Sequence, residues 1–175
     1  MNVLLMDRDG TINQSPGFGQ YVKSWEAFEF REDTVLAMHE LSLEGYSFIV
    51  ITNQAGIARG MVGLNELENI HINMKNELLN DGIEILDIYI CPHHWNEGCY
   101  CRKPSPGMLQ KASRDWLLRL DKTLYIGDDV RDCEAAYNAG MKSLFIGDDS
   151  KLSNLRDVQK PIYSSNKLSD ILPNI

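Results

Sequence analysis

The sequence lacks any apolar run long enough to cross a membrane. Its longest runs, such as VLLM and FIVI, fall far short of the roughly 18 residues that a membrane-spanning segment needs. It also lacks the pattern of a signal peptide, because charges at Asp7, Arg8 and Asp9 follow the first apolar residues almost at once. We therefore expect a cytoplasmic protein that does not associate with membranes.

The sequence is also short of positive charge. Its 17 Lys and Arg residues are outnumbered by 25 Asp and Glu residues, so the formal net charge at pH 7 is −8. An acidic surface repels backbone phosphates, and nucleic acid is therefore not expected as a partner. Any anionic ligand needs a pocket whose local charge is positive.

Cysteine is scarce outside one stretch. Residues 90–104, ICPHHWNEGCYCRKP, contain three of the four cysteines and two of the four histidines. In a reducing compartment such a cluster indicates metal binding rather than disulfides. Three thiolates and one imidazole suit tetrahedral Zn²⁺ in a closed structural site, with no position left for a reactive water. The predicted zinc ligands are Cys91, His93, Cys99 and Cys101; the alternative is a chance crowding of polar residues in a loop.

What the sequence does contain is a regular alternation of strand and helix patterns. Short apolar runs predict strands at 2–6, 47–52, 83–91, 123–127 and 142–147, with a further one at 161–165. Helical patterns cover about 33–44, 65–82, 106–119 and a segment ending at Gly140, with a weak helix at 167–172. An apolar content of 43% in 175 residues is enough for the core of one domain. We therefore predict a single doubly wound α/β domain over residues 1–175, with a mostly parallel sheet.

Some details of the helices can also be predicted. Asn65 and Glu68 have the spacing of a capping box, and Ser105 with Pro106 suits the first turn of a helix. His39 and His71 fall within helical patterns and are expected at the surface or at the edge of the core.

Polar side chains follow several of the predicted strands. Because ligands of such sheets bind beyond the carboxyl ends of the strands, these residues should converge at one edge. They are Asp7, Asp9, Gly10 and Thr11 after the first strand, Thr52, Asn53 and Gln54 after the second, Arg102 and Lys103 after the cysteine cluster, and Asp128, Asp129 and Asp132 after the fourth.

This set suits phosphoryl transfer. Three carboxylates gathered from two strand ends make a site of hard oxygen ligands for Mg²⁺. Thr52, Asn53 and Lys103 could surround a tetrahedral anion. Each motif taken alone could be only a turn or a helix cap. Their conjunction, in order and each at a strand end, favours a phosphate-handling enzyme.

The motifs DRDGT, TNQ, RKP and GDDVRD, in that order, resemble the four motifs of haloacid-dehalogenase (HAD) superfamily phosphatases. Longer stretches, LLMDRDGTIN, ITNQAGIARG, ICPHH…CYCRKPSPGML and YIGDD…AAYNAG, closely resemble D-glycero-D-manno-heptose 1,7-bisphosphate 7-phosphatases. Histidinol-phosphatases are near relatives with the same type of zinc loop. The similarity runs from residue 1 to about 147 and implies an HAD-like Rossmannoid fold with a minimal cap or none.

The resemblance also implies roles for individual residues. Asp7 would be the nucleophile that forms an aspartyl-phosphate, and Asp9 the general acid and base. Mg²⁺ would be held by Asp7, the Asp9 backbone carbonyl and Asp128. Thr52, Asn53 and Lys103 would hold the transferred phosphoryl group. Residues placed near the substrate are Gly19, Gln20, Tyr21, Gln54, Arg59, Arg102 and Asp129.

Two features depart from the heptose bisphosphatase pattern. Those enzymes often have Lys at the position of Asp129, and only five residues separate His93 from Cys99, as in histidinol-phosphatases. Arg59 and Arg102 nevertheless favour a substrate with a second phosphate. We therefore expect a heptose bisphosphate, used for cell-surface glycans, with histidinol phosphate or another small sugar phosphate as the alternative.

Other classes of function fit less well. A signalling receiver is also phosphorylated on aspartate, but receivers have an adjacent acid pair after the first strand and a phosphoacceptor after a later one. A non-catalytic binding protein with this fold is disfavoured because every catalytic position holds a competent residue. A small phosphorylated sugar is therefore the expected partner, and the protein is expected to be a monomer.

Overall fold

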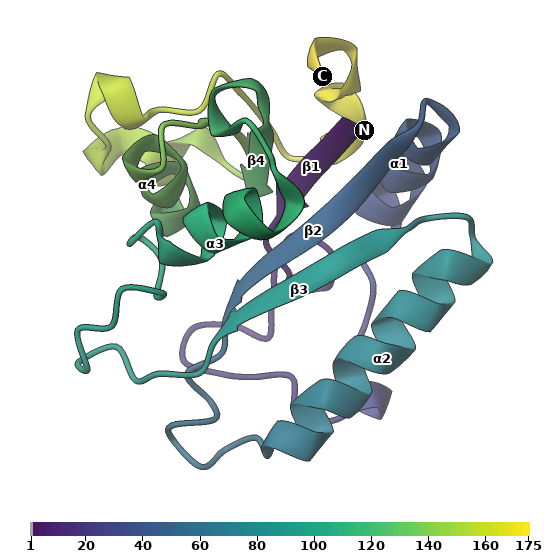
Figure 1. The fold of residues 1–175 in the computed structure, drawn as a ribbon, viewed down its shortest axis with the longest axis vertical. Helices are drawn as coiled ribbons and strands as arrows, with labels where there is room; N and C mark the ends of the chain where they lie inside the picture. Colours follow the sequence, from purple (N-terminus) through teal and green to yellow (C-terminus); the bar gives the residue numbers. More distant parts are fainter. Residues whose placement is uncertain (1) are drawn as a thin grey trace.

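The computed structural model describes residues 2–175 as a six-stranded parallel sheet with helices on both faces (Figure 1). The strands are β1 (Asn2–Met6), β2 (Tyr46–Asn53), β3 (Ile85–Cys91), β4 (Leu124–Gly127), β5 (Lys142–Ile146) and β6 (Tyr163–Ser165). Their order across the sheet is β3-β2-β1-β4-β5-β6, and every neighbouring pair is parallel. The predicted doubly wound α/β architecture is confirmed.

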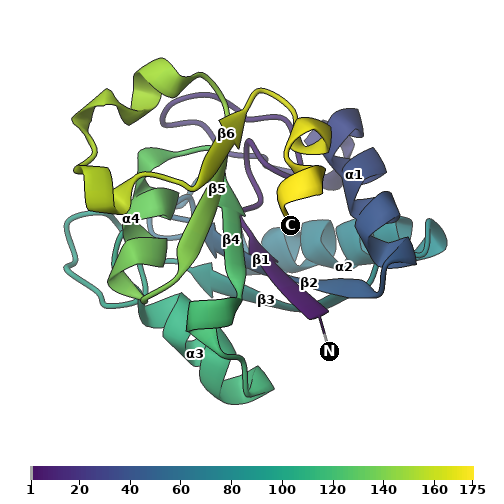
Figure 2. The same ribbon diagram turned by 90° about the horizontal axis from the view of Figure 1, so that it is seen from above.

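Within the described residues, four α-helices cover the two faces of the sheet, as Figures 1 and 2 show. Helices α1 (Glu32–Leu43) and α2 (Leu64–Asn80) lie on one face, and α3 (Gly107–Trp116) and α4 (Val130–Asn138) on the other. The linking segments contain six 3₁₀ turns, which are Trp25–Ala27, Leu120–Lys122, Asp149–Asn154, Asp157–Gln159, Leu168–Asp170 and Leu172–Asn174. Within residues 2–175, no helix combines the length and apolarity that crossing a membrane requires.

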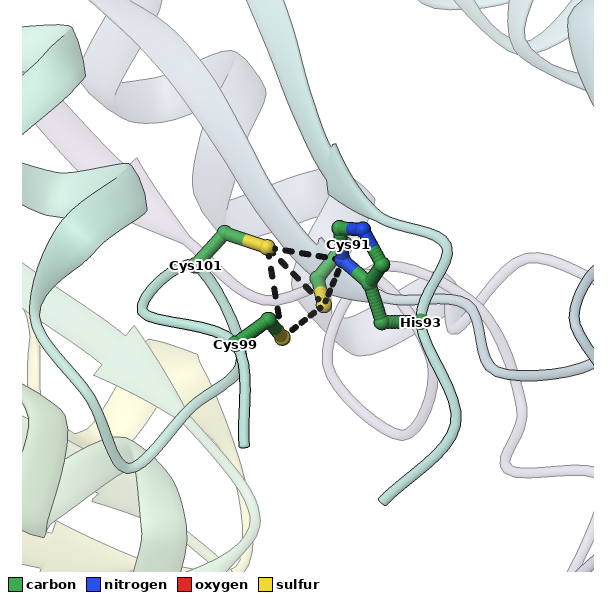
Figure 3. Close-up of side chains that lie close together, drawn as sticks. All are labelled: Cys91, His93, Cys99 and Cys101. Atoms are coloured by element: carbon green, nitrogen blue, oxygen red, sulfur yellow. Dashed lines mark hydrogen bonds between the residues drawn. The ribbon is translucent and has the colours of Figure 1, made fainter. Parts of the chain in front are cut away.

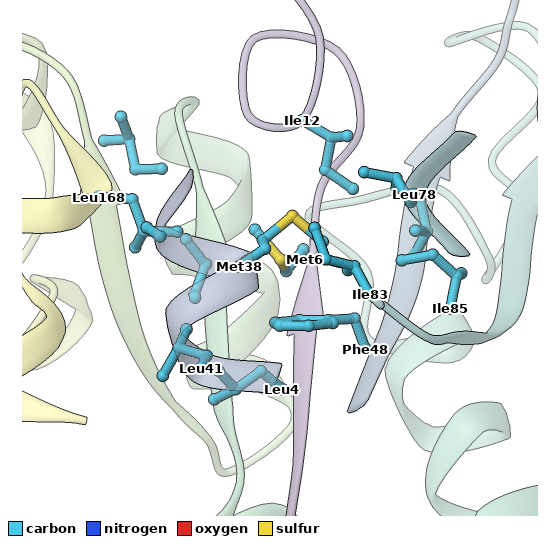
Figure 4. Close-up of a cluster of buried hydrophobic side chains, with 14 of the residues drawn as sticks. Leu4, Met6, Ile12, Met38, Leu41, Phe48, Leu78, Ile83, Ile85 and Leu168 are labelled. Atoms are coloured by element: carbon cyan, nitrogen blue, oxygen red, sulfur yellow. The ribbon is translucent and has the colours of Figure 1, made fainter. Parts of the chain in front are cut away.

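The central strands are buried on both faces, which explains why they appear in the sequence as continuous apolar runs. On one face, Leu4, Met6 and Phe48 pack with Met38 of α1 and Leu78 of α2 (Figure 4). On the other face, the alternate residues of the same strands pack against α3 and α4; these include Val3, Leu5, Ile49, Ile51, Met108, Leu109, Ala135 and Ala136. Two cores therefore hold the carboxyl ends of the strands in fixed positions.

Several predicted helix ends differ from the observed ones. Helix α2 has Gly63 at its N-cap, so Asn65 lies inside the helix and the predicted capping box does not form. Helix α3 begins after Pro106 without a side-chain cap, and it ends at Trp116 because Leu117 takes a left-handed conformation with φ of 52°. The weak helix predicted at 167–172 is instead a pair of 3₁₀ turns. Tertiary packing overrides local propensity at these ends.

The chain changes direction across the sheet between β1 and β4. From β1 it proceeds outward through β2 to β3, and then returns to place β4 on the other side of β1. The backbone amide of Asp7 donates to the carbonyl of Ile126 at 2.9 Å, which ties these two strand ends together. In open α/β sheets such a switch point opens a crevice for ligands. Asp7 and Asp128 both follow the strands that form it.

Candidate active site

The loop after β1 lies directly against the loop after β4. Gly10 has φ of +90°, and a Cβ built on it would lie 2.1 Å from a carboxylate oxygen of Asp128. The hydroxyl of Thr11 donates to Asp128 Oδ1 at 3.3 Å. The DRDGT motif therefore needs glycine for its backbone conformation and for its close approach to the acid of the other strand. Asp7 and Asp128 are brought together by this contact.

Lys103 is buried at the centre of the site. Its ammonium lies 2.8 Å from Asp7 Oδ1 and 2.7 Å from Asp132 Oδ1. It also lies 3.0 Å from the carbonyl oxygen of Ile51 and 2.9 Å from the hydroxyl of Tyr125. Residues from the loop after β1 and from β2, β4 and α4 therefore surround a single positive charge.

Asp132 and Tyr125 have roles that the sequence analysis did not assign. Asp132 is buried, with Oδ1 accepting from the Tyr125 hydroxyl at 3.1 Å and Oδ2 accepting from the backbone amide of Asp129 at 3.1 Å. The spacing of the last motif, GDDVRD, placed Asp132 near this edge. Its pairing with Lys103 joins residues far apart in the sequence and is visible only in three dimensions.

The carboxylates around Lys103 carry more negative charge than one lysine can balance. Carboxylate oxygens of Asp7, Asp128 and Asp132 all lie within 4.8 Å of one another. Burial first, and then Asp132, raise the pKa of Asp128 to about 7. Burial also raises the pKa of Asp7 despite the opposing charge of Lys103. An acidic, oxygen-rich group of this kind fits a hard divalent cation such as Mg²⁺.

Lys103 stays protonated in these surroundings. Burial acts to lower the pKa of its ammonium, but the negative charges of Asp132 and Asp7 outweigh that effect and raise it. A permanent cation beside Asp7 is what a bound phosphoryl group requires.

Asp9 lies beside Asp7 but points into a separate set of hydrogen bonds. Its carboxylate accepts from both Nη2 and Nε of Arg8, from the amide of Asn13 at 3.0 Å and from the amide of Gln54 at 2.8 Å. Burial acts to raise the pKa of Asp9, but the charge and hydrogen bonds of Arg8 outweigh it and lower the pKa. Its side chain remains 22% exposed, so part of the carboxylate is open to the site.

The residues at the end of β2, Thr52 and Asn53, and Gln54 directly after it make contacts of two kinds. The side chain of Asn53 accepts from the backbone amide of Lys103 at 3.1 Å and donates to its carbonyl at 3.2 Å. The buried amide of Gln54 donates to Asp9 and to the Thr52 hydroxyl, each at 2.8 Å. Asn53 and Gln54 are predicted beside the substrate, and their side chains also hold other site residues in position.

The remaining predicted substrate residues lie at the rim. The guanidinium of Arg59 donates to the carbonyl of Gly19 at 3.2 Å, and it lies over the rings of Tyr21 and Trp95, 5.7 and 5.1 Å from their centroids. Gln20 is exposed in the same loop as Gly19. One guanidinium nitrogen of Arg102, Nη1, is buried without a hydrogen-bond partner among the described residues. Arg59 thus joins the 17–21 loop to the cysteine-rich loop.

Asp129 is positioned as a helix cap. Its carboxylate accepts from the backbone amide of Arg131 at 2.9 Å and from that residue's guanidinium at 2.8 Å, at the N-terminus of α4. Asp129 therefore lies at the edge of the site with its charge balanced by Arg131.

Cys91, His93, Cys99 and Cys101 point toward a common centre (Figure 3). Their sulfur and Nδ1 atoms all lie within 4.8 Å of one another, with His93 3.1 Å from Cys101 and 3.6 Å from Cys91. The edges of a tetrahedron around Zn²⁺ measure about 3.8 Å, given a Zn–S bond of about 2.3 Å. The predicted four residues are thus brought together in a geometry that fits zinc.

Two cavities lie away from this site. One of about 380 Å³ opens at the opposite edge of the sheet, beside Asn2, Arg119 and Lys122. Another of about 330 Å³ lies between α1 and α2. The first is lined by Arg119 and Lys122 without a carboxylate side chain, and the second by Glu32, Glu77 and Asp81 without a cation, so neither combines acids with a lysine as the strand ends do.

Comparisons with known proteins agree with this geometry. A family model described as polynucleotide kinase 3 phosphatase matches residues 2–159. The D-glycero-beta-D-manno-heptose-1,7-bisphosphate 7-phosphatase of Salmonella typhi is 40% identical over 151 residues, covering 81% of this chain and 78% of that protein. A histidine biosynthesis bifunctional protein of Campylobacter jejuni is 32% identical over 163 residues, covering 93% of this chain but only 45% of that protein.

A solved structure is similar over almost the whole chain. It is the D,D-heptose 1,7-bisphosphate phosphatase of B. bronchiseptica in complex with magnesium and phosphate, with a TM-score of 0.89 and 29% identity over 99% of this chain and 97% of that one. The predicted family resemblance is confirmed. The chain belongs to the family of HAD-superfamily phosphatases that includes the D-glycero-D-manno-heptose-1,7-bisphosphate 7-phosphatases.

Proposed function

We propose that this protein is a Mg²⁺-dependent phosphomonoesterase that removes the 7-phosphate of D-glycero-D-manno-heptose 1,7-bisphosphate and leaves heptose 1-phosphate. The observation that carries this proposal is the convergence of Asp7, Asp128 and Lys103 at the switch point of the sheet. Such a site supplies a carboxylate nucleophile, ligands for a cation and a fixed positive charge.

The cation would be held by the carboxylates of Asp7 and Asp128 and by the backbone carbonyl of Asp9. Asp132 contributes to the acidic group but is engaged by Lys103 and by the start of α4. When bound, Mg²⁺ would neutralise negative charge and so reduce the repulsion between a carboxylate and a phosphate. A structure of a relative described as complexed with magnesium and phosphate supports this choice of ion.

In the first half of the reaction, a carboxylate oxygen of Asp7 attacks phosphorus. The bond between phosphorus and the sugar oxygen breaks, and Asp9 gives a proton to that oxygen. Asp9 is ionised in the free protein, because its neighbours lower its pKa. A bound phosphate brings negative charge close to Asp9 and raises its pKa, which populates the protonated form as the substrate binds.

In the second half, water attacks the phosphorus of the aspartyl-phosphate. Asp9 takes a proton from that water, inorganic phosphate leaves, and the carboxylate of Asp7 is restored. Lys103 and the Thr52 hydroxyl would hold the phosphoryl oxygens during both steps. Asn53 would act by fixing the backbone of Lys103, to which its side chain is bonded on both sides.

The rim of the site would select the substrate. Arg59 and Arg102 would be the cations that meet a second phosphate, and Gly19, Gln20 and Tyr21 would form the facing loop, to which Arg59 is hydrogen-bonded. Asp129 would set the boundary of the site through its pairing with Arg131. We propose a small phosphorylated sugar as the substrate of a monomeric, cytoplasmic enzyme.

Zn²⁺ would serve a structural role in this protein. Cys91 ends β3, and Cys101 is only two residues before Lys103. A metal held by Cys91, His93, Cys99 and Cys101 would therefore fix the irregular loop that delivers Lys103 to the phosphate. All four ligand positions belong to the protein, which is typical of a closed structural site.

The substrate is tested with a panel of sugar phosphates that includes both anomers of heptose 1,7-bisphosphate. Phosphorus NMR should show loss of the 7-phosphate resonance of at least one anomer and persistence of the 1-phosphate, only when Mg²⁺ is present. Loss of the 1-phosphate instead, or no turnover of either anomer, would overturn the proposed substrate.

Histidinol phosphate is the second candidate substrate. The short spacing between His93 and Cys99 and the similarity to a histidine biosynthesis protein both favour including it in the panel. Histidinol phosphate lacks a second phosphate, so Arg59→Ala and Arg102→Ala should impair turnover of the bisphosphate far more than turnover of histidinol phosphate.

A further inference from the structure

Arg8 is a buried cation that the proposed chemistry does not use. Its side chain has no exposed surface, and Nη2 lies 2.8 and 2.9 Å from the two carboxylate oxygens of Asp9. Nε adds a longer bond of 3.2 Å to Asp9 Oδ1. Its other terminal nitrogen, Nη1, lies 2.8 Å from Nε2 of His71 in the middle of α2.

The chemistry of the two side chains fixes which atom donates. Arginine has only donors, so Nε2 of His71 must be the acceptor and its single ring proton must lie on Nδ1. Burial and the positive charge of Arg8 lower the pKa of His71 to about 3, so the ring is neutral at ordinary pH. His71 was expected at the surface or at the edge of the core, whereas it is 9% exposed and bonded to the active-site loop.

A neutral acceptor behind Arg8 has a specific consequence. A carboxylate in place of His71 would compete with Asp9 for the charge of the guanidinium. The neutral imidazole satisfies one donor of Arg8 and leaves its charge directed at Asp9 alone. It also prevents Arg8 from rotating, because a buried donor without a partner is costly.

We propose that Arg8, anchored by His71, is a positioning residue that fixes the Asp9 carboxylate in the orientation required for proton transfer to the leaving oxygen. The geometry that supports this is a chain of contacts from α2, through His71 and Arg8, to Asp9, with Asn13 and Gln54 bonding the same carboxylate from other sides. The proposal rests on the role of Asp9 in the proposed function.

A positioning role predicts an effect that depends on the leaving group. A sugar alkoxide needs a proton to leave, whereas p-nitrophenolate leaves without one. The ratio kcat/KM covers the steps up to the first irreversible one, here the loss of the leaving group. Loosening Asp9 should therefore lower kcat/KM for a sugar phosphate much more than for p-nitrophenyl phosphate.

The test compares two variants at the anchor. In His71→Met the acceptor is lost and a side chain suited to a buried helix remains, while the amide oxygen of His71→Gln can still accept from Arg8. General acid catalysis typically raises the rate about 100-fold or more. Because His71→Met should misplace the Asp9 carboxylate only partly, it should lower kcat/KM about tenfold for the best sugar phosphate. For p-nitrophenyl phosphate the loss should be less than threefold. The kcat/KM of His71→Gln should stay within about threefold of the wild-type value for both substrates. His39→Met, which changes an exposed histidine of α1, is the control and should leave both ratios unchanged.

Three kinetic results would overturn the proposal. They are equal losses on both substrates, no loss on either, and a loss in His71→Gln as large as that in His71→Met. Using whichever sugar phosphate the wild type hydrolyses best keeps the comparison valid if heptose bisphosphate is not the substrate. A wild type that hydrolyses p-nitrophenyl phosphate but no sugar phosphate would refute the proposed function.

The wild-type protein provides a measurement that does not depend on the variants folding. A long-range ¹H–¹⁵N spectrum at pH 6 should show His71 as neutral, with its proton on Nδ1. A proton on Nε2, or on both ring nitrogens, would exclude donation by Arg8 and overturn the anchor.

Discussion

At the scale of single residues, the site is organised around one buried lysine. Lys103 forms ion pairs with two carboxylates, Asp7 and Asp132, and contacts the oxygens of Tyr125 and Ile51. A buried ammonium with four oxygen neighbours is fixed in position before any phosphate arrives. Pre-organised charge of this kind is the main source of catalysis in phosphoryl transfer.

Replacing this lysine should abolish that pre-organisation. Lys103→Met should lower kcat/KM by at least about 100-fold, the usual effect of losing one stabilising group in the transition state. It should also destabilise the fold by about 3 kcal/mol, because Asp7 and Asp132 lose their buried partner. Lys111→Met, at an exposed position of α3, should change neither quantity. Denaturant unfolding and steady-state kinetics measure both, and near-normal activity of Lys103→Met would contradict the role.

Asp7 should be essential for chemistry but not for folding. Asp7→Asn keeps the shape of the side chain and removes its charge, so turnover should fall more than about 1,000-fold, as is usual when a nucleophile is lost. The raised pKa of Asp7 shows that its ionised form is unfavourable in the metal-free fold. Thermal stability of Asp7→Asn without Mg²⁺ should therefore be no lower than that of the wild type. Residual activity above one part in a hundred would identify a different nucleophile.

At the scale of elements, the segment between β3 and α3 has no apolar core of its own. Cys99 and Cys101 pack at the edge of the core, while Trp95 and Tyr100 are 56% and 61% exposed. Four metal ligands would replace the missing core, and the loop then continues directly into Arg102 and Lys103. Bound zinc would therefore be coupled, through this loop, to the position of Lys103.

Loss of one thiolate should release this loop. Cys101→Ser should reduce bound zinc from about one per chain to near zero, lower the melting temperature, and decrease activity because Lys103 loses its support. Cys133→Ser, outside the cluster in α4, should retain the full zinc content. Elemental analysis of both proteins measures the difference; a wild-type chain that is stable and active without zinc would contradict the structural role.

The sequence predicts best what is encoded locally. The strand ends, the DRDGT loop and the Cys/His spacing depend on short stretches, and the structure brings the residues concerned to one edge. Contacts between distant residues could not be predicted. Asn53 bonds the backbone of Lys103, and His71 accepts from Arg8, only because tertiary packing places them side by side. Helix ends such as Gly63 are likewise set by packing rather than by propensity.

At the scale of the whole molecule, stability and cation binding should be linked through pH. The folded protein raises the pKa of Asp128 from 3.8 to about 7, by burial and by Asp132, and also raises that of Asp7. A carboxyl group whose pKa is higher in the folded than in the unfolded state stabilises the folded state fully below about pH 4, where it is protonated in both. This contribution disappears as the pH rises through the pKa of Asp128 in the folded protein, near 7. Stability without a divalent cation should therefore decline over that range.

Mg²⁺ should reverse this decline. The ion binds the ionised carboxylates, so it should raise the melting temperature more at pH 8 than at pH 5. Differential scanning fluorimetry with and without Mg²⁺ at the two pH values gives the comparison. A larger effect at pH 5, or none at either, would argue against a cation site formed by Asp7 and Asp128.

The most direct test of the catalytic assignment is a rapid-quench experiment on Asp9→Asn with p-nitrophenyl phosphate and Mg²⁺. This substrate needs no acid to lose its leaving group, but hydrolysis of the aspartyl-phosphate still needs Asp9 as a base. We predict a burst of about one nitrophenolate per chain, followed by slow turnover, with the phosphate found by peptide mass spectrometry on Asp7. Steady turnover without a burst, or a phosphate on any other residue, would contradict the mechanism.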